Sequence, residues 1–372
     1  MSEQLHSAQE ARGARFRKLA NADVARHYGD GAAEYDAVRR SAGIAVRSDL
    51  VPLRMWGRDP IRMLHGLVTN DLTAMTPEQG VYATMLTPKG RTIAEMRVFL
   101  RPEKGPELVL LMPREALEGT SAHLRKFVPP MFARWNDASE ETGVLGVYGP
   151  SAHRLLRGMF GAALPPEDEE ASSEALIGDS RILIIFSRDA GAEPGYDLVV
   201  PRTELEPLWS RLLREGEALG ARPIGFGALE TLRIEAGRPR YGSELTEETI
   251  PTEAFEKIGW MPRAISFTKG CYTGQEVIVR IAHRGHVNRQ LRGLLLGDSP
   301  TPALRTPLIS AETGKQVGWT ASAATSPQLR QTIALGYVRR EFSAGDTLRL
   351  ESQDGPVATV VDLPFITPAG TE

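Results

Sequence analysis

The chain has 372 residues, a net charge of −3, 41% apolar and 24% charged side chains, which is ordinary for a soluble globular protein of more than one domain. Without a long run of like charge, nothing indicates direct nucleic-acid binding. The N-terminus lacks the apolar core of a secretory signal, and the longest apolar run, 182–186, is too short to span a bilayer. Together with a single unpaired cysteine, these features predict a cytoplasmic protein without a membrane partner.

The first part of the chain predicts mixed helix and strand. Residues 1–40 carry scattered helical signals, and a strand is expected around 42–49. Asp59 is expected to cap a helix that has Pro60 at its first position, where the missing N–H costs nothing. Alternating patterns and a glycine turn predict strands at 82–87, 92–100 and 107–112, with a helix at 114–127.

The middle of the chain continues in the same mixed manner. Strands are predicted at 144–148, 181–186 and 196–200. The pair Thr203 and Glu206 predicts a capping box for a helix that closes at Gly220, and another helix is expected at 226–236. The acidic segment 165–170 predicts a mobile loop.

From about residue 285 the pattern changes to short alternating strands separated by Gly, Pro and Ser. The predicted strands lie at 291–296, 316–322, 332–338, 347–351 and 356–362. Several short strands with frequent turns predict a small antiparallel barrel.

Glu235 stands in the last turn of the helix expected at 226–236. A carboxylate there faces the negative end of the helix dipole, which disfavours it by about a few tenths of a kcal/mol. Its position therefore indicates a partner that needs a carboxylate. The alternative is a surface residue paired with Arg233 or Arg238.

The only cysteine, Cys271, lies between Gly270 and Gly274 in the stretch Lys-Gly-Cys-Tyr-Thr-Gly-Gln-Glu, residues 269–276. A lone cysteine is either a small buried apolar residue or a reactive thiol. Residues 275–283 fit a helix or a strand. If they are helical, the helix N-terminus and Lys269 favour the thiolate of Cys271, and we favour the reactive interpretation. One cysteine alone cannot hold a zinc ion or a four-iron cluster, and no metal site is predicted.

The segment 225–237, followed by Tyr241-Gly242, resembles the folate-binding segment of the aminomethyltransferase (T-protein) superfamily. The stretches 318–320 and 333–338 look like the barrel domain of that superfamily, and 42–44 and 69–71 resemble its start. The resemblance implies an α+β fold of three domains. These are a folate-binding core of 1–52 and 139–284, an inserted α+β domain of 53–138, and a barrel of 285–372.

Within the superfamily, residues 269–276 are similar to the hallmark of the YgfZ branch. That branch is implicated in tetrahydrofolate-dependent assembly or repair of iron–sulfur clusters and, through such an enzyme, in tRNA modification. The resemblance therefore implies folate as ligand and iron–sulfur enzymes or cluster-assembly proteins as partners.

Two departures from the T-protein pattern weigh against glycine cleavage. The T-protein has a pair of aspartates, one of them catalytic, where this chain reads Ile93-Ala94-Glu95-Met96. A Tyr-Thr-Gly-Glu-Asp-Gly loop of the T-protein is replaced by residues 189–195.

The resemblance also assigns roles to single residues. Glu235 is expected to accept two hydrogen bonds from the pterin edge, with Tyr82 and Arg233 as further cofactor-binding residues; core packing is the alternative for Tyr82. Cys271 and Lys269 are the predicted catalytic residues, with bound folate changing the reactivity of the thiol. The main predicted function is support of iron–sulfur enzymes. The alternatives are an aminomethyltransferase or folate-dependent demethylase, and a folate-binding adaptor without turnover.

Overall fold

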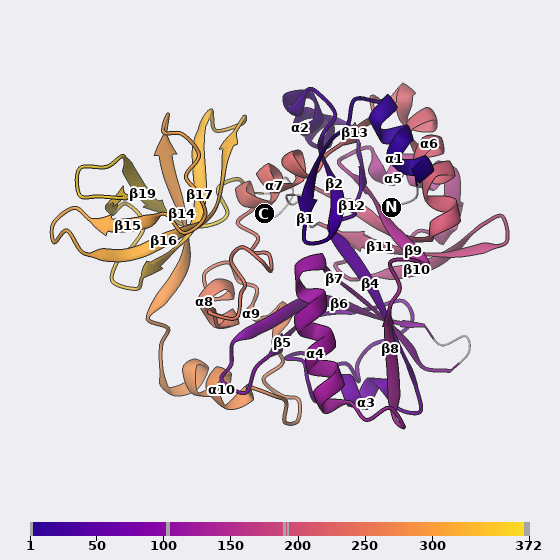
Figure 1. Cartoon of the computed structure of the whole chain (residues 1–372), viewed down its shortest axis with the longest axis horizontal. Helices are drawn as coiled ribbons and strands as arrows, with labels where there is room; N and C mark the ends of the chain where they lie inside the picture. Colours follow the sequence, from indigo (N-terminus) through magenta and orange to yellow (C-terminus); the bar gives the residue numbers. More distant parts are fainter. Residues whose placement is uncertain (1–2, 102–104, 189–190, 192, 368–372) are drawn as a thin grey trace.

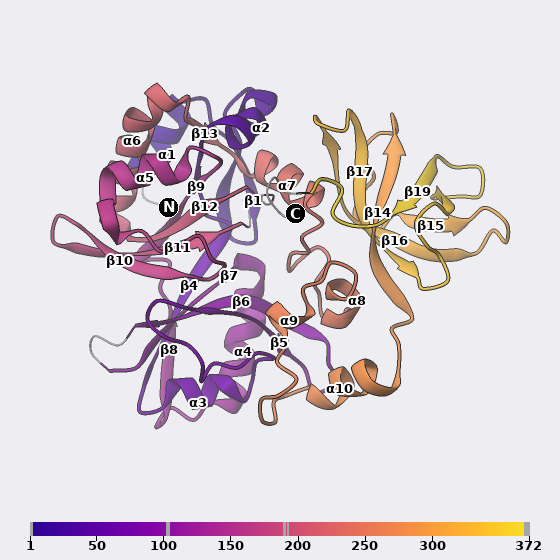
Figure 2. The same cartoon turned by 180° about the vertical axis from the view of Figure 1, so that it is seen from behind.

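The computed structural model describes residues 3–101, 105–188, 191 and 193–367, and its strands form three sheets and one isolated hairpin (Figure 1). Two of the sheets pack face to face, and the third is a closed barrel on the other side of a helical connection (Figures 1 and 2). Among the described residues, no helix has both the length and the hydropathy needed to cross a bilayer. Of the segment 189–195, residues 189, 190 and 192 lie outside the described residues.

The first sheet has six strands in the order β10 (Ser172–Ile177), β11 (Ser180–Ser187), β12 (Gly195–Pro201), β9 (Thr142–Tyr148), β3 (Gly43–Val46) and β13 (Arg222–Ile224). Neighbouring strands are antiparallel except β13, which runs parallel to β3. Helices α1 (Glu3–Ala11), α5 (Ala152–Phe160) and α6 (Leu205–Gly216) share one apolar core with this sheet. A second core joins the sheet to α2 (Gly31–Arg40) and α7 (Phe226–Glu235).

Helix α6 has the predicted apolar stripe but lacks the predicted capping box. Its apolar stripe is buried as predicted, with Trp209 fully covered. The predicted capping box of Thr203 and Glu206 is wrong, since α6 begins after Glu204 and no side chain caps it. A single 3-10 turn, Arg202–Glu204, runs directly into the helix and supplies a carbonyl to the Leu205 N–H, so the first turn needs no side-chain cap.

The second sheet has five antiparallel strands in the order β5 (Val81–Leu86), β6 (Thr92–Arg101), β7 (Glu107–Pro113), β4 (Leu50–Gly57) and β8 (Ala133–Asp137). Helices α3 (Pro60–His65) and α4 (Leu117–Phe127) cover one face, and the predicted cap of α3 by Asp59 with Pro60 at its start is confirmed. On the other face, Phe99, Val109 and Leu111 pack against strands of the first sheet.

The C-terminal barrel is closed and antiparallel, in the order β14 (Arg289–Gly297), β17 (Gln331–Arg339), β16 (Gln316–Ser326), β15 (Pro307–Ser310), β18 (Thr347–Leu350) and β19 (Val357–Val361). The sequence predicted five of these six strands. It missed β15, in which the apolar residues Leu308 and Ile309 are adjacent and do not alternate with polar ones. β15 pairs with both β16 and β18 and so closes the barrel. The predicted α+β class with a C-terminal antiparallel barrel is confirmed.

Three short helices connect the first two sheets to the barrel: α8 (Pro251–Phe255), α9 (Met261–Ala264) and α10 (Gln275–Arg284) (Figure 1). Of the two alternatives for residues 275–283, the structure forms the helix. It begins after Gly274, whose φ of 84° is in the left-handed region that glycine tolerates best. The domain ranges 1–52 with 139–284, 53–138 and 285–372 stay a prediction.

The N-terminal hairpin of β1 (Arg15–Leu19) and β2 (Ala22–His27) is absent from the sequence prediction. β1 is rich in basic residues and mostly exposed, and β2 buries two adjacent residues, Val24 and Ala25, so neither strand shows the apolar alternation by which a half-buried strand is recognised. Helix α7 holds the hairpin in place, because Gly225 at its N-terminus lies directly against the backbone of Arg26. Tertiary packing, rather than local preference, decides this element.

Candidate functional site

A small cavity lies where the two packed sheets meet α7 and the segment before α9. Strands β5 and β6 contribute Tyr82, Glu95 and Arg97, and Trp260 adds an aromatic ring. The cavity has a volume of about 80 Å³. A hollow of about 560 Å³ near α1 is larger, but it is lined by surface residues such as Glu3 and Glu10. We take the smaller cavity as the candidate site because it combines a buried carboxylate with aromatic rings, as small-molecule sites do.

Two carboxylates line this cavity, those of Asp49 and Glu95, and Asp49 is paired with Arg47. Glu95 is 7% exposed, and its two oxygens accept from different partners. The Tyr82 hydroxyl donates to Oε2 at 2.5 Å, and the backbone N–H of Tyr241 donates to Oε1 at 2.7 Å. The Tyr82 ring in turn meets the Trp260 ring edge-on, with centroids 5.6 Å apart. Both the position and the orientation of the carboxylate are therefore fixed, and it takes the place where the sequence resemblance expects the T-protein aspartates.

Two arginines of the cavity lining, Arg47 and Arg97, belong to a buried charged network that sequence reasoning missed. Asp197 on β12 is fully buried and accepts from Arg97 Nη2 at 2.6 Å and from the Tyr148 hydroxyl. Arg47 lies 3.5 Å from the same carboxylate. Burial raises the pKa of Tyr148 far above its ordinary value, so this hydroxyl stays a neutral donor. The sequence did hold one signal of this network: Asp197 is an acid within the otherwise apolar strand predicted at 196–200.

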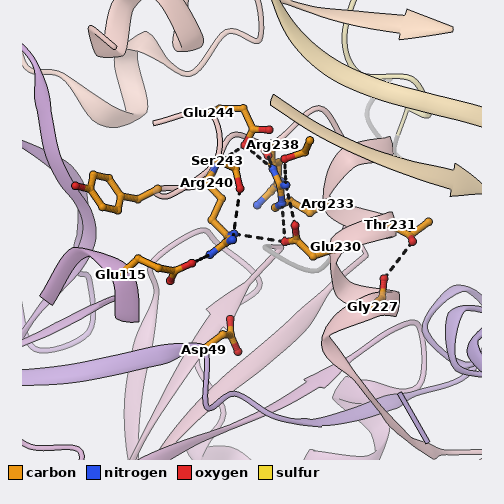
Figure 3. Close-up of polar contacts among 12 residues, drawn as sticks. Asp49, Glu115, Gly227, Glu230, Thr231, Arg233, Arg238, Arg240, Ser243 and Glu244 are labelled. Atoms are coloured by element: carbon orange, nitrogen blue, oxygen red, sulfur yellow. Dashed lines mark hydrogen bonds and ion pairs between the residues drawn. The ribbon is translucent and has the colours of Figure 1, made fainter. Parts of the chain in front are cut away.

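Arg233 lines the cavity, but its guanidinium is used within the protein (Figure 3). Its Nε and Nη2 donate to Glu230 at 2.9 and 3.0 Å, and its Nη1 donates to Glu244 at 2.9 Å. Burial alone would raise the pKa of Glu230, but Arg233 and Arg240 outweigh it and lower the pKa to about 2. In this structure Arg233 shapes a wall of the cavity. Its predicted contact with a cofactor stays a prediction.

Glu235 lies away from the cavity, fully buried between α7, α2 and the barrel. Its carboxylate accepts from Arg39 Nη2 at 2.5 Å, from the Tyr35 hydroxyl at 2.8 Å and from the hydroxyl of Ser326 on β16. The sequence predicted that Glu235 needs a partner, and that partner is Arg39 on α2. To bind a pterin as predicted, the Glu235 carboxylate would have to replace these hydrogen bonds by hydrogen bonds to the ligand.

Cys271 and Lys269 lie in the loop before α10 and do not line the cavity. Cys271 is an exposed free thiol. Lys269 is 7% exposed, and its ammonium donates to the carbonyls of His65, Val68 and Asn70 at 2.6, 2.7 and 2.9 Å. Burial lowers the pKa of Lys269 to about 8, against a smaller opposing effect of Asp71. Of the predicted site residues, the structure brings Tyr82 and Arg233 together with Glu95.

The contacts of Lys269 give a stability prediction. Replacing it in the Lys269→Met variant removes the donor of three carbonyls at the end of α3, and we expect a loss of about 2 kcal/mol or more in the free energy of unfolding. Urea denaturation measures this loss. Lys257→Met, at an exposed position in the same connection, is the control. An unchanged Lys269→Met stability would show that water replaces the ammonium at no cost.

Comparisons with known proteins cover nearly the whole chain. Residues 5–262 match the family model described as the GCVT N-terminal domain, and residues 289–366 match the glycine cleavage T-protein C-terminal barrel domain. The chain is 32% identical over 337 residues to an aminomethyltransferase of Shouchella clausii, covering 89% of this chain and 88% of the relative. It is 30% identical over 336 residues to an aminomethyltransferase of Frankia alni, covering 90% and 88%.

A solved structure agrees with these matches at the level of the fold. The aminomethyltransferase T of the glycine cleavage system from Bartonella henselae superposes with a TM-score of 0.82 at 20% identity, covering 98% of this chain and 97% of that chain. The predicted T-protein fold is thereby confirmed. Since the N-terminal model alone matches more than half of the chain, this protein belongs to the glycine cleavage T-protein family.

Proposed function

We propose that this protein is a folate-dependent transferase of the aminomethyltransferase type, with tetrahydrofolate bound in the cavity around Glu95. The observation that carries the proposal is the buried Glu95 carboxylate, held by Tyr82 and Tyr241 beside the ring of Trp260. An aromatic cavity with an oriented carboxylate suits a flat heterocycle and proton transfer at its nitrogens. The curated relatives support this function over the predicted iron–sulfur role.

The reaction follows from the groups involved. An aminomethyl donor X–CH2–NH2 reacts with tetrahydrofolate, which loses a proton from each of two nitrogens. The carbon then bridges those nitrogens as 5,10-methylenetetrahydrofolate, while X–H and ammonia leave. Atoms balance and no oxidant is needed. Glu95 can donate a proton to the departing amine and accept one from a folate nitrogen, as a positioned carboxyl group does in general acid–base catalysis.

The cavity must widen to admit the ligand. Its volume of about 80 Å³ is smaller than the engineered cavity of about 150 Å³ that holds benzene in another protein, and a pterin is larger than benzene. The side chains of Trp260 and Arg238 lie at its lining and are the groups to move. We therefore expect ligand binding to be coupled to a rearrangement of the cavity wall.

The direct test mixes the purified protein with tetrahydrofolate and an S-aminomethyl thiol, and measures methylenetetrahydrofolate and ammonia. We expect both products in equal amounts, in excess over the enzyme. Folate binding without any product would instead favour the folate-binding adaptor. Absence of folate binding, with the protein shown to be folded, would contradict the proposal altogether.

A second candidate function rests on the loop 269–276. Its similarity to the YgfZ hallmark and the exposure of Cys271 favour a role in supporting iron–sulfur enzymes, with the thiol facing a partner protein. Cys271 lies outside the cavity, so it can act independently of the transfer reaction. The iron–sulfur partner and the link to tRNA modification belong to this second candidate.

The two candidates predict different results for Cys271→Ala. If Cys271 serves a partner protein, the variant keeps one-carbon transfer but lowers iron–sulfur enzyme activities in cells. An alkylating reagent should modify one thiol per chain, faster than free cysteine at neutral pH. A change of that rate with bound tetrahydrofolate would link the loop to the cavity. A slow rate, together with normal iron–sulfur enzyme activities in the variant, would remove the second candidate.

A further inference from the structure

Two arginines stand beside the cavity and stack on its aromatic rings. The guanidinium of Arg238 lies 5.1 Å from the centroid of the Trp260 ring. Arg263 lies 4.5 Å from the same ring and 4.9 Å from the ring of Tyr82. Arg238, Trp260 and Tyr82 all line the cavity. A guanidinium stacked on a ring keeps its edge available for carboxylate oxygens, which it can bind bidentately.

That edge is occupied by two consecutive acids from the loop between α5 and β10. Glu169 bridges the arginines, since its Oε1 accepts from Arg238 Nη2 at 3.0 Å and its other oxygen pairs with Arg263. Glu170 accepts from the same nitrogen of Arg263 at 2.5 Å. The C-terminal residues of the segment 165–170, which was predicted to be a mobile loop, are thus anchored at the edge of the cavity.

The backbone also holds these acids in place. The carbonyl of Glu170 accepts from the N–H of Gly80 at 2.9 Å, and the carbonyl of Glu169 accepts from the Gln79 side chain at 2.8 Å. Glu170 has a φ of 62°, in the left-handed region that a residue with a Cβ adopts only at a cost. The contacts with Gly80 and with Arg263 offset that cost.

Resting on the proposed function, we propose that Arg238 and Arg263 form the subsite for the carboxylates of the folate glutamate tail, and that Glu169 and Glu170 occupy it in the ligand-free protein. The glutamate tail of tetrahydrofolate carries two carboxylates, and these can take the places of the two carboxylates that pair with Arg263. The acids are therefore an internal competitor of the tail.

Differences among the arginines of the cavity support this assignment. Arg233 and Arg240 are paired with Glu230, Glu244 and Glu115. The Glu244 side chain is fully buried, so exchanging it would uncover a buried charge at high cost. The Glu169 side chain is 26% exposed and stands in a loop, so its contacts can be exchanged for those of a ligand at a lower cost. The Glu170 side chain is 7% exposed and costs more to displace, but its left-handed backbone relaxes when it leaves, which offsets part of that cost.

The test compares tetrahydrofolate with the uncharged amide of tetrahydropteroate (tetrahydropteroate below), which lacks both tail carboxylates, by titration calorimetry on the full-length protein. In the double variant Glu169→Gln with Glu170→Gln, the competing charges are gone while the side-chain shapes remain. We expect tetrahydrofolate to bind about 5- to 10-fold more tightly, which is about 1 to 1.4 kcal/mol. Tetrahydropteroate should bind as it does to the unmodified protein.

The opposite change is expected for the arginines. Arg238→Gln and, separately, Arg263→Gln should weaken tetrahydrofolate binding about 10-fold and leave tetrahydropteroate binding unchanged. Glu167→Gln is the matched control, because Glu167 stands in the same loop but pairs with His153. It should change neither affinity. Thermal melts establish that each variant is folded.

The outcomes separate this inference from the proposed function. If the double variant tightens both ligands equally, the acids only close the cavity and the tail subsite is wrong. If tetrahydrofolate binds the unmodified protein but no variant changes its affinity, the inference is overturned while the proposed function stands. If neither ligand binds the folded, unmodified protein, the proposed function itself fails, and the inference with it.

Discussion

The variant Glu95→Gln should lower kcat for one-carbon transfer by about 100-fold or more, while tetrahydrofolate still binds. The amide has nearly the shape of the carboxylate, and its oxygen can still accept from Tyr82 or Tyr241. It can neither give up nor take a proton. Steady-state and single-turnover kinetics measure the effect on transfer, and calorimetry measures the Kd of the folate.

A matched control separates chemistry from folding. Glu107 stands on β7 of the same sheet and accepts from Arg54 Nε at 2.8 Å, outside the cavity, so Glu107→Gln should keep full activity. If Glu95→Gln also keeps its activity, Glu95 is not the acid–base group. If it loses folate binding to the same degree as activity, its carboxylate binds the ligand rather than moving a proton.

The second large effect concerns stability. Glu235→Ala should lower the free energy of unfolding by about 3 kcal/mol or more. The variant removes the fully buried carboxylate that lies closest to the guanidinium of Arg39 and leaves that charge without it. The same change removes the acceptor of Tyr35 and Ser326 and so loosens the contact of α7 with the barrel. Urea denaturation measures the loss, and a double-mutant cycle with Arg39→Ala isolates the pair.

Arg39 has a second carboxylate partner, which supplies the control. Glu193 pairs with Arg39 Nη1 at 3.0 Å, and its side chain is 19% exposed, so Glu193→Ala should cost much less than Glu235→Ala. The competing hypothesis gives Glu235 the role of binding a pterin. Normal stability combined with lost folate binding in Glu235→Ala would favour that hypothesis over the structural role.

Local patterns were enough to predict much of the fold. Asp59 with Pro60 marks the start of α3, and the apolar stripe of α6 is buried as its spacing indicates. Both signals involve residues within a few positions of each other, where the chain geometry is nearly fixed. The hairpin β1–β2 and the strand β15 were not predicted, because segments further along the chain stabilise them: α7 packs on the hairpin, and β18 pairs with β15.

The candidate site depends more strongly on tertiary structure. The sequence was enough to identify the T-protein superfamily and the barrel, and to predict that Glu235 needs a partner. The folded structure was needed to show that Arg39 is that partner, that buried Asp197 binds Arg97 of the cavity lining, and that Cys271 lies outside the cavity. These relations join residues far apart in the chain, so no local spacing encodes them. Packing of the two sheets, α7 and the barrel brings them together.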